Sequence, residues 1–240
     1  MTENGAPRDV GVIIVAAGAG TRARGAQRAG GPELKQFRWV AGKPMLLHSV
    51  QTFMAHPSVG TVVCVLPERF AGDPPPWLFQ CDVDRLLVSI GGRTRSESVS
   101  NGLDDLPDEA QVVLVHDAAR PLVGHATIDR VIDAVRDGTP TIAALPVVDT
   151  LKETDADGRI VRTVDRSTLW RAQTPQGFPR AVLVEAHRRA RAERITATDD
   201  AALCERLGQV VRVVRGSERA LKVTDTGDFA RVEALYAVEE

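Results

Sequence analysis

The stretch Val12-Ile13-Ile14-Val15-Ala16-Ala17-Gly18-Ala19-Gly20-Thr21-Arg22 decides the fold predicted for this chain. Residues 10–16 are almost all apolar and rich in β-branched side chains, which is typical of a strand buried on both faces of a parallel sheet. Gly18 and Gly20 then allow the backbone to turn sharply and to bring its N–H groups close to an anion. The stretch therefore predicts a buried strand that ends in a phosphate-binding loop.

Basic residues follow the two glycines. They are Arg22, Arg24, Arg28 and Lys35, and Glu33 is the one acid among them. This much positive charge suits more negative charge than a single phosphate group carries. A nucleoside triphosphate is therefore the predicted ligand.

A dinucleotide is the closest competing ligand, because Gly18-x-Gly20-x-x-Ala23 also fits the dinucleotide fingerprint after a strand. That fingerprint requires a helix after the glycines and an acid about 20 positions further on. Residues 24–32 are too rich in glycine for a good helix, and Phe37-Arg38-Trp39-Val40 contains no acid. A plain glycine turn is the alternative that the glycines alone leave open, and the basic cluster favours phosphate binding over it.

Composition predicts one α/β domain, residues 1–240, with no linker or internal repeat. The net charge of −2 and the isoelectric point near 6.2 argue against a nucleic-acid partner. Cys64, Cys81 and Cys204 form no C-x-x-C pair, which argues against a zinc site and a disulfide framework. The polar N-terminus and the lack of a long apolar run predict a cytoplasmic protein without a membrane anchor.

Apolar, β-rich runs alternate with segments of helical period, which is the pattern of βαβ units. The predicted strands are residues 10–16, 61–66, 85–90, 111–116 and 140–148, with late strands at 209–214 and 220–223. The predicted helices are residues 44–56, 94–106, 127–136, 179–194, 198–207 and 226–238. Thr94 and Glu97 have the spacing of a capping box at the start of one helix.

Residues 148–170 depart from this alternation. Asp157-Gly158 lies between two β-rich, polar arms, 149–154 and 160–166, which predicts a hairpin. Arms this polar do not fit inside the main core, so the hairpin is expected to project and to pack on a partner subunit. A loose surface hairpin is the alternative that the spacing alone leaves open.

Four segments carry a resemblance to one family. They are Ala16-Ala17-Gly18-x-Gly20-x-Arg22 with Lys35-Gln36, Val115-His116-Asp117-Ala118-Ala119-Arg120-Pro121, Thr163-Val164-Asp165-Arg166-x-x-Leu169-Trp170-x-x-x-Thr174-Pro175-Gln176, and Leu221-Lys222-Val223-Thr224. Over nearly its whole length the chain resembles the 2-C-methyl-D-erythritol 4-phosphate cytidylyltransferases. The first segment alone indicates only a nucleotidyltransferase, whereas the second and third together are specific to this family.

The resemblance implies a three-layer, Rossmann-like nucleotidyltransferase fold with a mostly parallel sheet and a protruding β-hairpin arm. It also implies that CMP is transferred from CTP to 2-C-methyl-D-erythritol 4-phosphate, with Mg²⁺ as the cofactor. The products would be 4-diphosphocytidyl-2-C-methyl-D-erythritol and pyrophosphate, in the non-mevalonate route to isoprenoid precursors. The family's homodimer would form through the arm. A cytidylyltransferase for another polyol phosphate, such as ribitol 5-phosphate, is the nearest alternative.

The same resemblance implies roles for individual residues. Arg22, Lys35 and Lys222 would be catalytic, and Asp117 would approach the metal. The nucleotide would lie against Ala16, Ala17, Gly18, Gly20, Gly92, Arg95, Ser98 and Arg120. The sugar phosphate would be held by Thr150, Arg166, Thr174 and Thr198, with Thr150 and Arg166 coming from the other subunit. The chain departs from the family pattern at Val15, at Arg93 and in the long stretch 24–33.

These residue types suit the implied chemistry. A phosphate monoester is largely dianionic at neutral pH and needs no general base to attack a triphosphate. Cations and Mg²⁺ oppose the charge repulsion, and a carboxylate such as Asp117 supplies the oxygen that Mg²⁺ prefers. A turn-capping role is the plainer interpretation of Asp117.

His116 is interpreted as structural, and His48, His56, His125 and His187 as helix-surface or helix-end residues. A nucleotide-binding regulator without turnover and a dinucleotide-dependent oxidoreductase are the alternatives of other classes.

Overall fold

A seven-stranded sheet forms the centre of the protein, whose computed structural model describes residues 7–18 and 34–238. Its strand order is β11-β7-β10-β6-β1-β4-β5. The strands are β1 Val10–Val15, β4 Val59–Leu66, β5 Leu86–Ile90, β6 Val112–Asp117, β7 Thr141–Pro146, β10 Trp170–Pro179 and β11 Arg212–Arg215. Strand β10 runs antiparallel to both of its neighbours, and the other neighbouring pairs are parallel. The predicted mostly parallel α/β sheet is confirmed.

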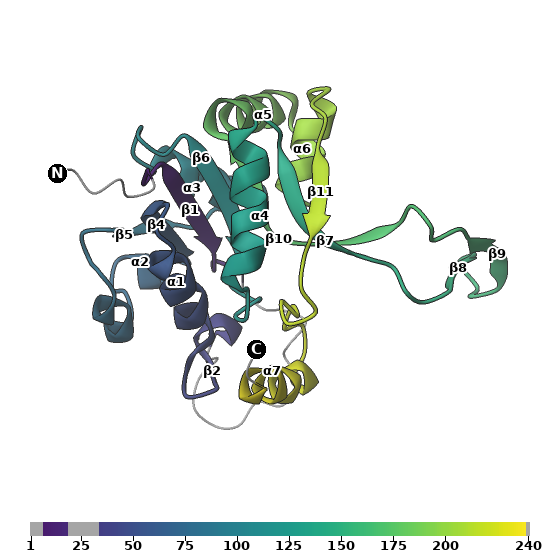
Figure 1. Cartoon of the computed structure of the whole chain (residues 1–240), viewed down its shortest axis with the longest axis horizontal. Helices are drawn as coiled ribbons and strands as arrows, with labels where there is room; N and C mark the ends of the chain where they lie inside the picture. The colour runs from purple at the N-terminus through teal and green to yellow at the C-terminus, as the bar shows by residue number, and fades with distance from the viewer. Residues whose placement is uncertain (1–6, 19–33, 239–240) are drawn as a thin grey trace.

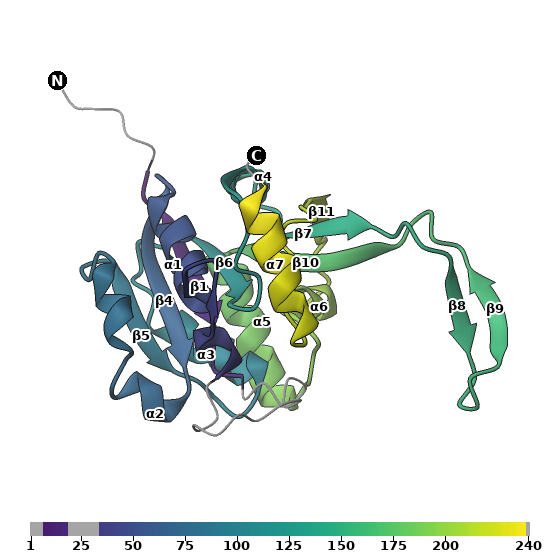
Figure 2. The ribbon, with the colours of Figure 1, turned by 90° about the horizontal axis from the view of Figure 1, so that it is seen from below.

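Helices cover both faces of this sheet, which gives the three layers that Figures 1 and 2 show. One face carries α1 Met45–Ala55, α2 Glu68–Ala71 and α4 His125–Arg136, and the other carries α3 Arg95–Asp104, α5 Arg180–Glu193 and α6 Asp200–Arg206. Successive β1 side chains point to opposite faces. Val12 and Ile14 pack in the cluster with α1 and α4, whereas Ile13 packs in the cluster with α3, α5 and α6. The burial of β1 on both faces explains its unbroken apolar sequence.

A smaller layer lies beside the end of the sheet. Helix α7 Gly227–Ala237 packs its Phe229 and Val232 on Val40 and Met45 in a third apolar cluster. Short elements complete the fold: the 3₁₀ turns η2 Lys35–Phe37 and η3 Pro76–Gln80, and the two-stranded β2 Trp39–Val40 and β3 Lys43–Pro44. No helix in residues 7–18 and 34–238 is long and apolar enough to cross a membrane.

The predicted hairpin is present and projects away from the sheet, to the right in Figures 1 and 2. Strands β8 Leu151–Thr154 and β9 Ile160–Val164 pair with each other in an antiparallel two-stranded sheet. The Asp155 carboxylate accepts the backbone N–H groups of Asp157 and Arg159 and so closes the turn. Ile160 and Val161 are 65% and 61% exposed, so the arm has an apolar surface that its own chain does not cover.

Two strand assignments from the sequence fail. Strand β10 was not predicted, because it contains two prolines, a glycine and several polar residues, and its pairing with β7 is irregular between Ala172 and Gln176. Residues 220–223 were predicted as a strand and are not one. Ala220 and Val223 are buried and Lys222 is exposed, and the Val223 N–H donates to the Ala119 carbonyl, so the segment packs beside the loop after β6 and does not join a sheet.

Three of the four histidines interpreted as surface or helix-end residues are buried. His48, His56 and His187 are 5%, 4% and 1% exposed. His56, at the C-cap of α1, and His125, the exposed first residue of α4, lie at helix ends as predicted. The buried rings have polar partners, such as the Val40 carbonyl oxygen 2.8 Å from His48 Nε2. Helical spacing could not predict the burial of these histidines, because their hydrogen-bond partners lie on other parts of the fold.

Gly102 on α3 tests how closely this helix packs on the sheet. A Cβ at this position would lie 2.7 Å from Ile13 Cγ2 and 2.9 Å from Val65 Cγ2. Gly102→Ala is therefore expected to destabilise the fold by about 1–3 kcal/mol through overpacking, although alanine is the better helix former. Gly72→Ala is the control, because no atom lies within 4 Å of its Cβ position. Urea unfolding of both variants measures the difference, and a stabilised Gly102→Ala protein would contradict the close packing.

His48 makes stability depend on pH. Burial lowers the pKa of His48 despite its hydrogen bond to Val40, and the charge of Lys43 lowers it further. As the pH falls below about 6.5, the unfolded chain binds a proton there before the folded protein does, so the free energy of unfolding decreases. Gln keeps a donor for the Val40 carbonyl and does not titrate. Between about pH 8 and pH 5, the wild type should lose more stability in urea unfolding than His48→Gln. Parallel losses in the two proteins would contradict this.

Candidate active site

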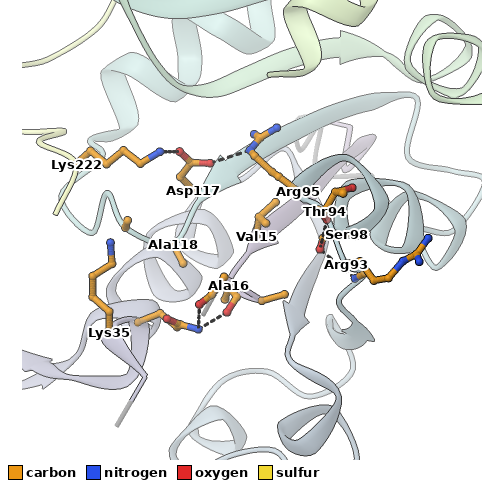
Figure 3. Close-up of a pocket in the computed structure, with 15 residues that line it drawn as sticks. Val15, Ala16, Lys35, Arg93, Thr94, Arg95, Ser98, Asp117, Ala118 and Lys222 are labelled. Carbon is orange, nitrogen blue, oxygen red and sulfur yellow. Dashed lines mark hydrogen bonds and ion pairs between the residues drawn. The ribbon is translucent and has the colours of Figure 1, made fainter. Parts of the chain in front are cut away.

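A pocket of about 460 Å³ opens at the carboxyl ends of β1 and β6 and at the start of α3, where ligands commonly bind in open parallel sheets (Figure 3). Val15 and Asp117, the last residues of these neighbouring strands, pair in register. The pocket is lined by Val15, Ala16, Ala17, Gly18, Lys35, Gln36, Gly92, Arg93, Thr94, Arg95, Ser98, Asp117, Ala118, Ala119 and Lys222. These residues come from five separate segments of the chain.

The segment after β1 is held in place by Gln36. The Ala16 N–H donates to the Val65 carbonyl, while the Ala16 carbonyl accepts a hydrogen bond from Gln36 Nε2. The same amide nitrogen lies 3.4 Å from the Gly18 carbonyl oxygen. Gln36 is buried, so it orients two backbone carbonyls of the predicted phosphate loop. The rest of that loop, with Gly20, Arg22, Arg24 and Arg28, lies outside the described residues.

The opposite wall is the start of α3. Thr94 caps the helix by accepting the Glu97 N–H at 3.0 Å, as predicted. The Glu97 carboxylate accepts the Arg93 N–H rather than that of Thr94, so the reciprocal half of the box is shifted by one residue. The Ser98 hydroxyl accepts the Gly92 N–H at 3.1 Å and donates to the Thr94 carbonyl. Ser98 thereby shapes the turn that enters the pocket.

The turn before α3 approaches the β1 loop too closely for a side chain. A Cβ on Gly91 would lie 2.1 Å from the Ala17 Cβ. Glycine at this position therefore lets the start of α3 reach the loop after β1. A helix N-terminus in this place favours an anionic ligand, because its first N–H groups lack helical partners.

Asp117 is the electrostatic centre of the pocket. Its Oδ2 lies 2.7 Å from Lys222 Nζ and its Oδ1 lies 3.3 Å from Arg95 Nε (Figure 3). Burial opposes the charged carboxylate, but the charges of Arg95, Lys222 and Arg120 outweigh it and hold the pKa of Asp117 well below its usual range. Asp117 is therefore ionised throughout the physiological range, with a cation on each oxygen.

Lys35 and Lys222 reach the same wall from distant parts of the sequence. Lys35, in η2, donates from Nζ to the Val223 carbonyl at 2.6 Å. The Val223 N–H in turn donates to the Ala119 carbonyl, close to Asp117 in the chain. The segment 220–223 thus joins both lysines to the loop after β6, although it is not a strand.

Arg120 holds this segment rather than lining the pocket. Its Nη1 donates to the Ala220 carbonyl at 2.7 Å and its Nη2 lies 3.3 Å from the Ala172 carbonyl oxygen. Arg120 therefore links the loop after β6 to β10 and to the segment that carries Lys222. The structure does not bring it to the pocket wall where the nucleotide was expected.

His116 and Thr174 support Asp117 from behind. The Asp117 N–H donates to Thr174 Oγ1 at 3.1 Å, so the Thr174 hydroxyl is left to donate to His116 Nδ1 at 3.0 Å. The other ring nitrogen then donates to the Arg120 carbonyl at 3.1 Å. Burial lowers the pKa of His116 to about 4, although the nearby Asp117 charge raises it. His116 is a neutral structural residue, as the sequence predicted.

The structure brings most of the predicted site residues together. Lining the pocket are Ala16, Ala17, Gly18, Lys35, Gly92, Arg95, Ser98, Asp117 and Lys222. Arg120 and Thr174 contact this wall from outside the pocket. Thr198 is exposed just before α6, and Thr150 and Arg166 are exposed on the arm, so this chain's own pocket does not include them.

Sequence reasoning gave no role to several lining residues. Gln36 was visible only as the neighbour of Lys35, and its contacts with the β1 loop depend on the tertiary fold. Thr94 was predicted only to cap the helix that follows it, and Ala118 and Ala119 were noted only as part of the segment 115–121 that carries the family resemblance. In the sequence, these residues could be found only as neighbours of the predicted site residues Lys35, Arg95 and Asp117.

Asp117 fits a Mg²⁺ ion only as a single protein ligand. Mg²⁺ is usually held by one or two carboxylates together with substrate phosphates. Within residues 7–18 and 34–238 no group of three or more His, Cys, Asp or Glu side chains is placed to hold a metal. The ionised carboxylate suits the ion, provided that phosphates and water complete its coordination.

A mostly parallel sheet, with lysines and a glycine-containing loop around a pocket at its carboxyl edge, defines a nucleotide-binding α/β protein. Comparison with known sequences narrows this class. The sequence profile of the 2-C-methyl-D-erythritol 4-phosphate cytidylyltransferases matches residues 10–237. The enzyme of that name from Salinibacter ruber is 43% identical over 227 residues, covering 94% of this chain and 92% of the relative. The one from Streptomyces coelicolor is 43% identical over 244 residues, covering 96% and 86%.

Solved structures give the same result. The crystal structure of 2-C-methyl-D-erythritol 4-phosphate cytidylyltransferase from Thermus thermophilus superposes with a TM-score of 0.79 at 33% identity, covering 96% of this chain and 100% of that chain. The chain described here belongs to the 2-C-methyl-D-erythritol 4-phosphate cytidylyltransferase family.

Proposed function

We propose that the pocket around Asp117 binds CTP and transfers CMP to 2-C-methyl-D-erythritol 4-phosphate. The products are 4-diphosphocytidyl-2-C-methyl-D-erythritol and pyrophosphate, in the biosynthesis of isoprenoid precursors. The observation that carries the proposal is the Lys222–Asp117–Arg95 arrangement beside Lys35, in a chain that belongs to this family. The names of the relatives favour methylerythritol phosphate over ribitol 5-phosphate as the acceptor.

The reaction needs electrostatic stabilisation more than proton transfer. An oxygen of the acceptor phosphate forms a bond to the α-phosphorus of CTP, and the bond from that phosphorus to the β-phosphate oxygen breaks. The bonding electrons leave with pyrophosphate. The attacking phosphate is already largely dianionic at neutral pH, so no base is required. This agrees with the state of His116, which directly precedes Asp117 and is neutral and fully buried.

Lys35 and Lys222 supply positive charge where the reaction needs it. We assign Lys35, with Arg22 of the basic loop, to the triphosphate and to the charge that develops at the transferring phosphoryl group. We assign Lys222 to the acceptor phosphate, because Lys222 is held on Asp117 at the rim and is 45% exposed. The Ala16–Gly18 loop and the Gly92–Ser98 turn form the nucleotide side. Asp117 would hold Mg²⁺, which when bound neutralises phosphate charge.

The arm completes the acceptor side in a homodimer. Thr150 directly precedes β8, Arg166 follows β9, and both are exposed, while Ile160 and Val161 of β9 are exposed apolar residues that a partner can cover. A second copy of the chain would cover that surface and bring these two polar side chains to the partner's pocket. We also propose a cytoplasmic location, where CTP is available.

Pyrophosphate release with CTP and Mg²⁺, measured over a panel of polyol and sugar phosphates, tests the proposed activity. Methylerythritol 4-phosphate should give the highest kcat/KM. Faster turnover of ribitol 5-phosphate would assign the alternative acceptor. CTP binding without any pyrophosphate release would instead indicate a regulator.

Asp117→Asn tests the central carboxylate. The amide keeps the shape but removes the charge that Lys222 and Arg95 share, so kcat should fall by about 10²- to 10³-fold. If Asp117 were only a turn cap, Asn would replace it well. Steady-state rates measure the loss, and circular dichroism checks that the fold remains. Asp104→Asn, which is exposed at the end of α3, is the control.

A mixture of inactive variants tests the shared site. Lys35→Ala and Arg166→Ala should each lower kcat strongly, because each removes a cation from the reacting phosphates. If the arm crosses to the partner, a mixed dimer has one doubly damaged site and one intact site. Equal mixing with random exchange makes half of the dimers mixed, so about one quarter of wild-type activity should return. Activity equal to the mean of the parents, with exchange confirmed by mass spectrometry, would place Arg166 in its own chain's site.

A further inference from the structure

The Arg95 guanidinium, which contacts Asp117, also contacts a second carboxylate, that of Asp200. Asp200 is the first residue of α6 and only 1% exposed. Its Oδ2 lies 2.6 Å from Arg95 Nη1, and its Oδ1 lies 2.9 Å from Nε2 of His187, a residue of α5 that is also 1% exposed. The segments that carry the family resemblance include neither Asp200 nor His187.

The contacts form a continuous series from the pocket into the core. Lys222 contacts Asp117, Asp117 contacts Arg95, Arg95 contacts Asp200 and Asp200 contacts His187. At its inner end, His187 Nε2 donates to the Asp200 carboxylate, which as an ionised group can only accept, and Nδ1 lies 3.5 Å from Ser96 Oγ. Both Asp200 oxygens therefore have partners, and its orientation is determined.

The position of Asp200 decides how Arg95 meets Asp117. A guanidinium facing one carboxylate prefers a bidentate pair, which would occupy both Asp117 oxygens. Here the Nη1 contact with Asp200 fixes the rotation of the guanidinium, and in that orientation Arg95 contacts Asp117 through Nε and Oδ1. The second oxygen, Oδ2, is left for Lys222. A buried ion pair of this kind adds little net stability over apolar packing, so a role in stability does not by itself account for it.

We propose that Asp200 and His187 are positioning residues for the cytidylyl transfer. Asp200 holds the Arg95 guanidinium so that it takes one Asp117 oxygen and leaves the other to Lys222, and His187 orients the Asp200 carboxylate. Neither residue touches the substrates. The inference rests on the proposed roles of Asp117 and Lys222.

Asp200→Asn removes the charge that engages Arg95. The guanidinium is then expected to turn onto both Asp117 oxygens and to displace Lys222. The loss should appear in kcat, by about 10- to 100-fold, as for other partners that orient a functional side chain. KM for CTP should change by less than about 3-fold, because the backbone of the Ala16–Gly18 loop and of the Gly92–Ser98 turn stays in place and only the Arg95 side chain moves. A lower melting temperature with unchanged kcat would overturn the proposal.

His187 offers a matched pair of variants. His187→Gln keeps an N–H donor for Asp200 and should keep most of the activity, whereas His187→Leu fills similar space without a donor and should lose kcat. Leu183→Ala, fully buried on the same helix, controls for lost stability: it should lower the melting temperature and leave kcat near that of the wild type. Equal kcat in the Gln and Leu variants would overturn the role of His187. This pair also tests the series if Asp200→Asn does not fold.

A double-mutant cycle with Arg95→Ala tests whether Asp200 affects kcat through Arg95. If Asp200 acts through Arg95, adding Asp200→Asn to Arg95→Ala should cause no further loss of kcat. Multiplied losses would show that Asp200 acts independently and would overturn the proposal. Asp117→Asn distinguishes failure of the proposed active site from failure of this inference. An active Asp117→Asn enzyme would overturn the proposed site. An inactive Asp117→Asn enzyme together with a fully active Asp200→Asn enzyme would overturn only the positioning role of Asp200.

Discussion

The ionised carboxylate of Asp117, held between Lys222 and Arg95, is the constraint on which the rest of the site depends. Burial alone would favour its neutral form, and the charges around it reverse that preference. The two cations that contact the carboxylate are Arg95 and Lys222, which reach Asp117 only when the sheet, α3 and the segment after β11 are in place. The charge state of the site is thus a property of the tertiary fold and not of the local motif around Asp117.

Hydrogen bonds with other strands and loops hold this charged centre in position. Thr174 of β10 accepts the Asp117 N–H and donates to His116 of β6, and Arg120 ties the segment of Lys222 to the same loop. Burial keeps His116 uncharged, so no further positive charge competes for the carboxylate. His116 and Arg120 of this motif therefore position their neighbours, whereas Asp117 itself lines the pocket.

The sequence was sufficient wherever structure follows from a local pattern. Strand β1 is buried on both faces, so its apolar run was unambiguous, and the amphipathic helices and the Asp157-Gly158 hairpin were found for similar reasons. Strand β10 was missed because its inner residues are polar: Gln173 and Thr174 serve hydrogen bonds with Ser217 and Asp117 that no local pattern reveals. The contact between Arg95 and Asp200 spans 105 positions, and the burial of His187 depends on that partner. Long-range polar pairing is what the sequence could not show.

Charge balance explains why a divalent cation suits this arrangement. Lys222, Asp117, Arg95 and Asp200 form an alternating series with two positive and two negative formal charges, so the resting network is neutral. A phosphate that draws Lys222 toward itself removes one cation from Asp117, while Arg95 remains divided between two carboxylates. The Asp117 oxygen released by Lys222 then carries uncompensated charge in a partly buried site, which is unfavourable unless another cation replaces the lysine. If the pocket works as proposed, phosphate binding by Lys222 and metal binding by Asp117 would thereby be coupled, because each would make the other less costly.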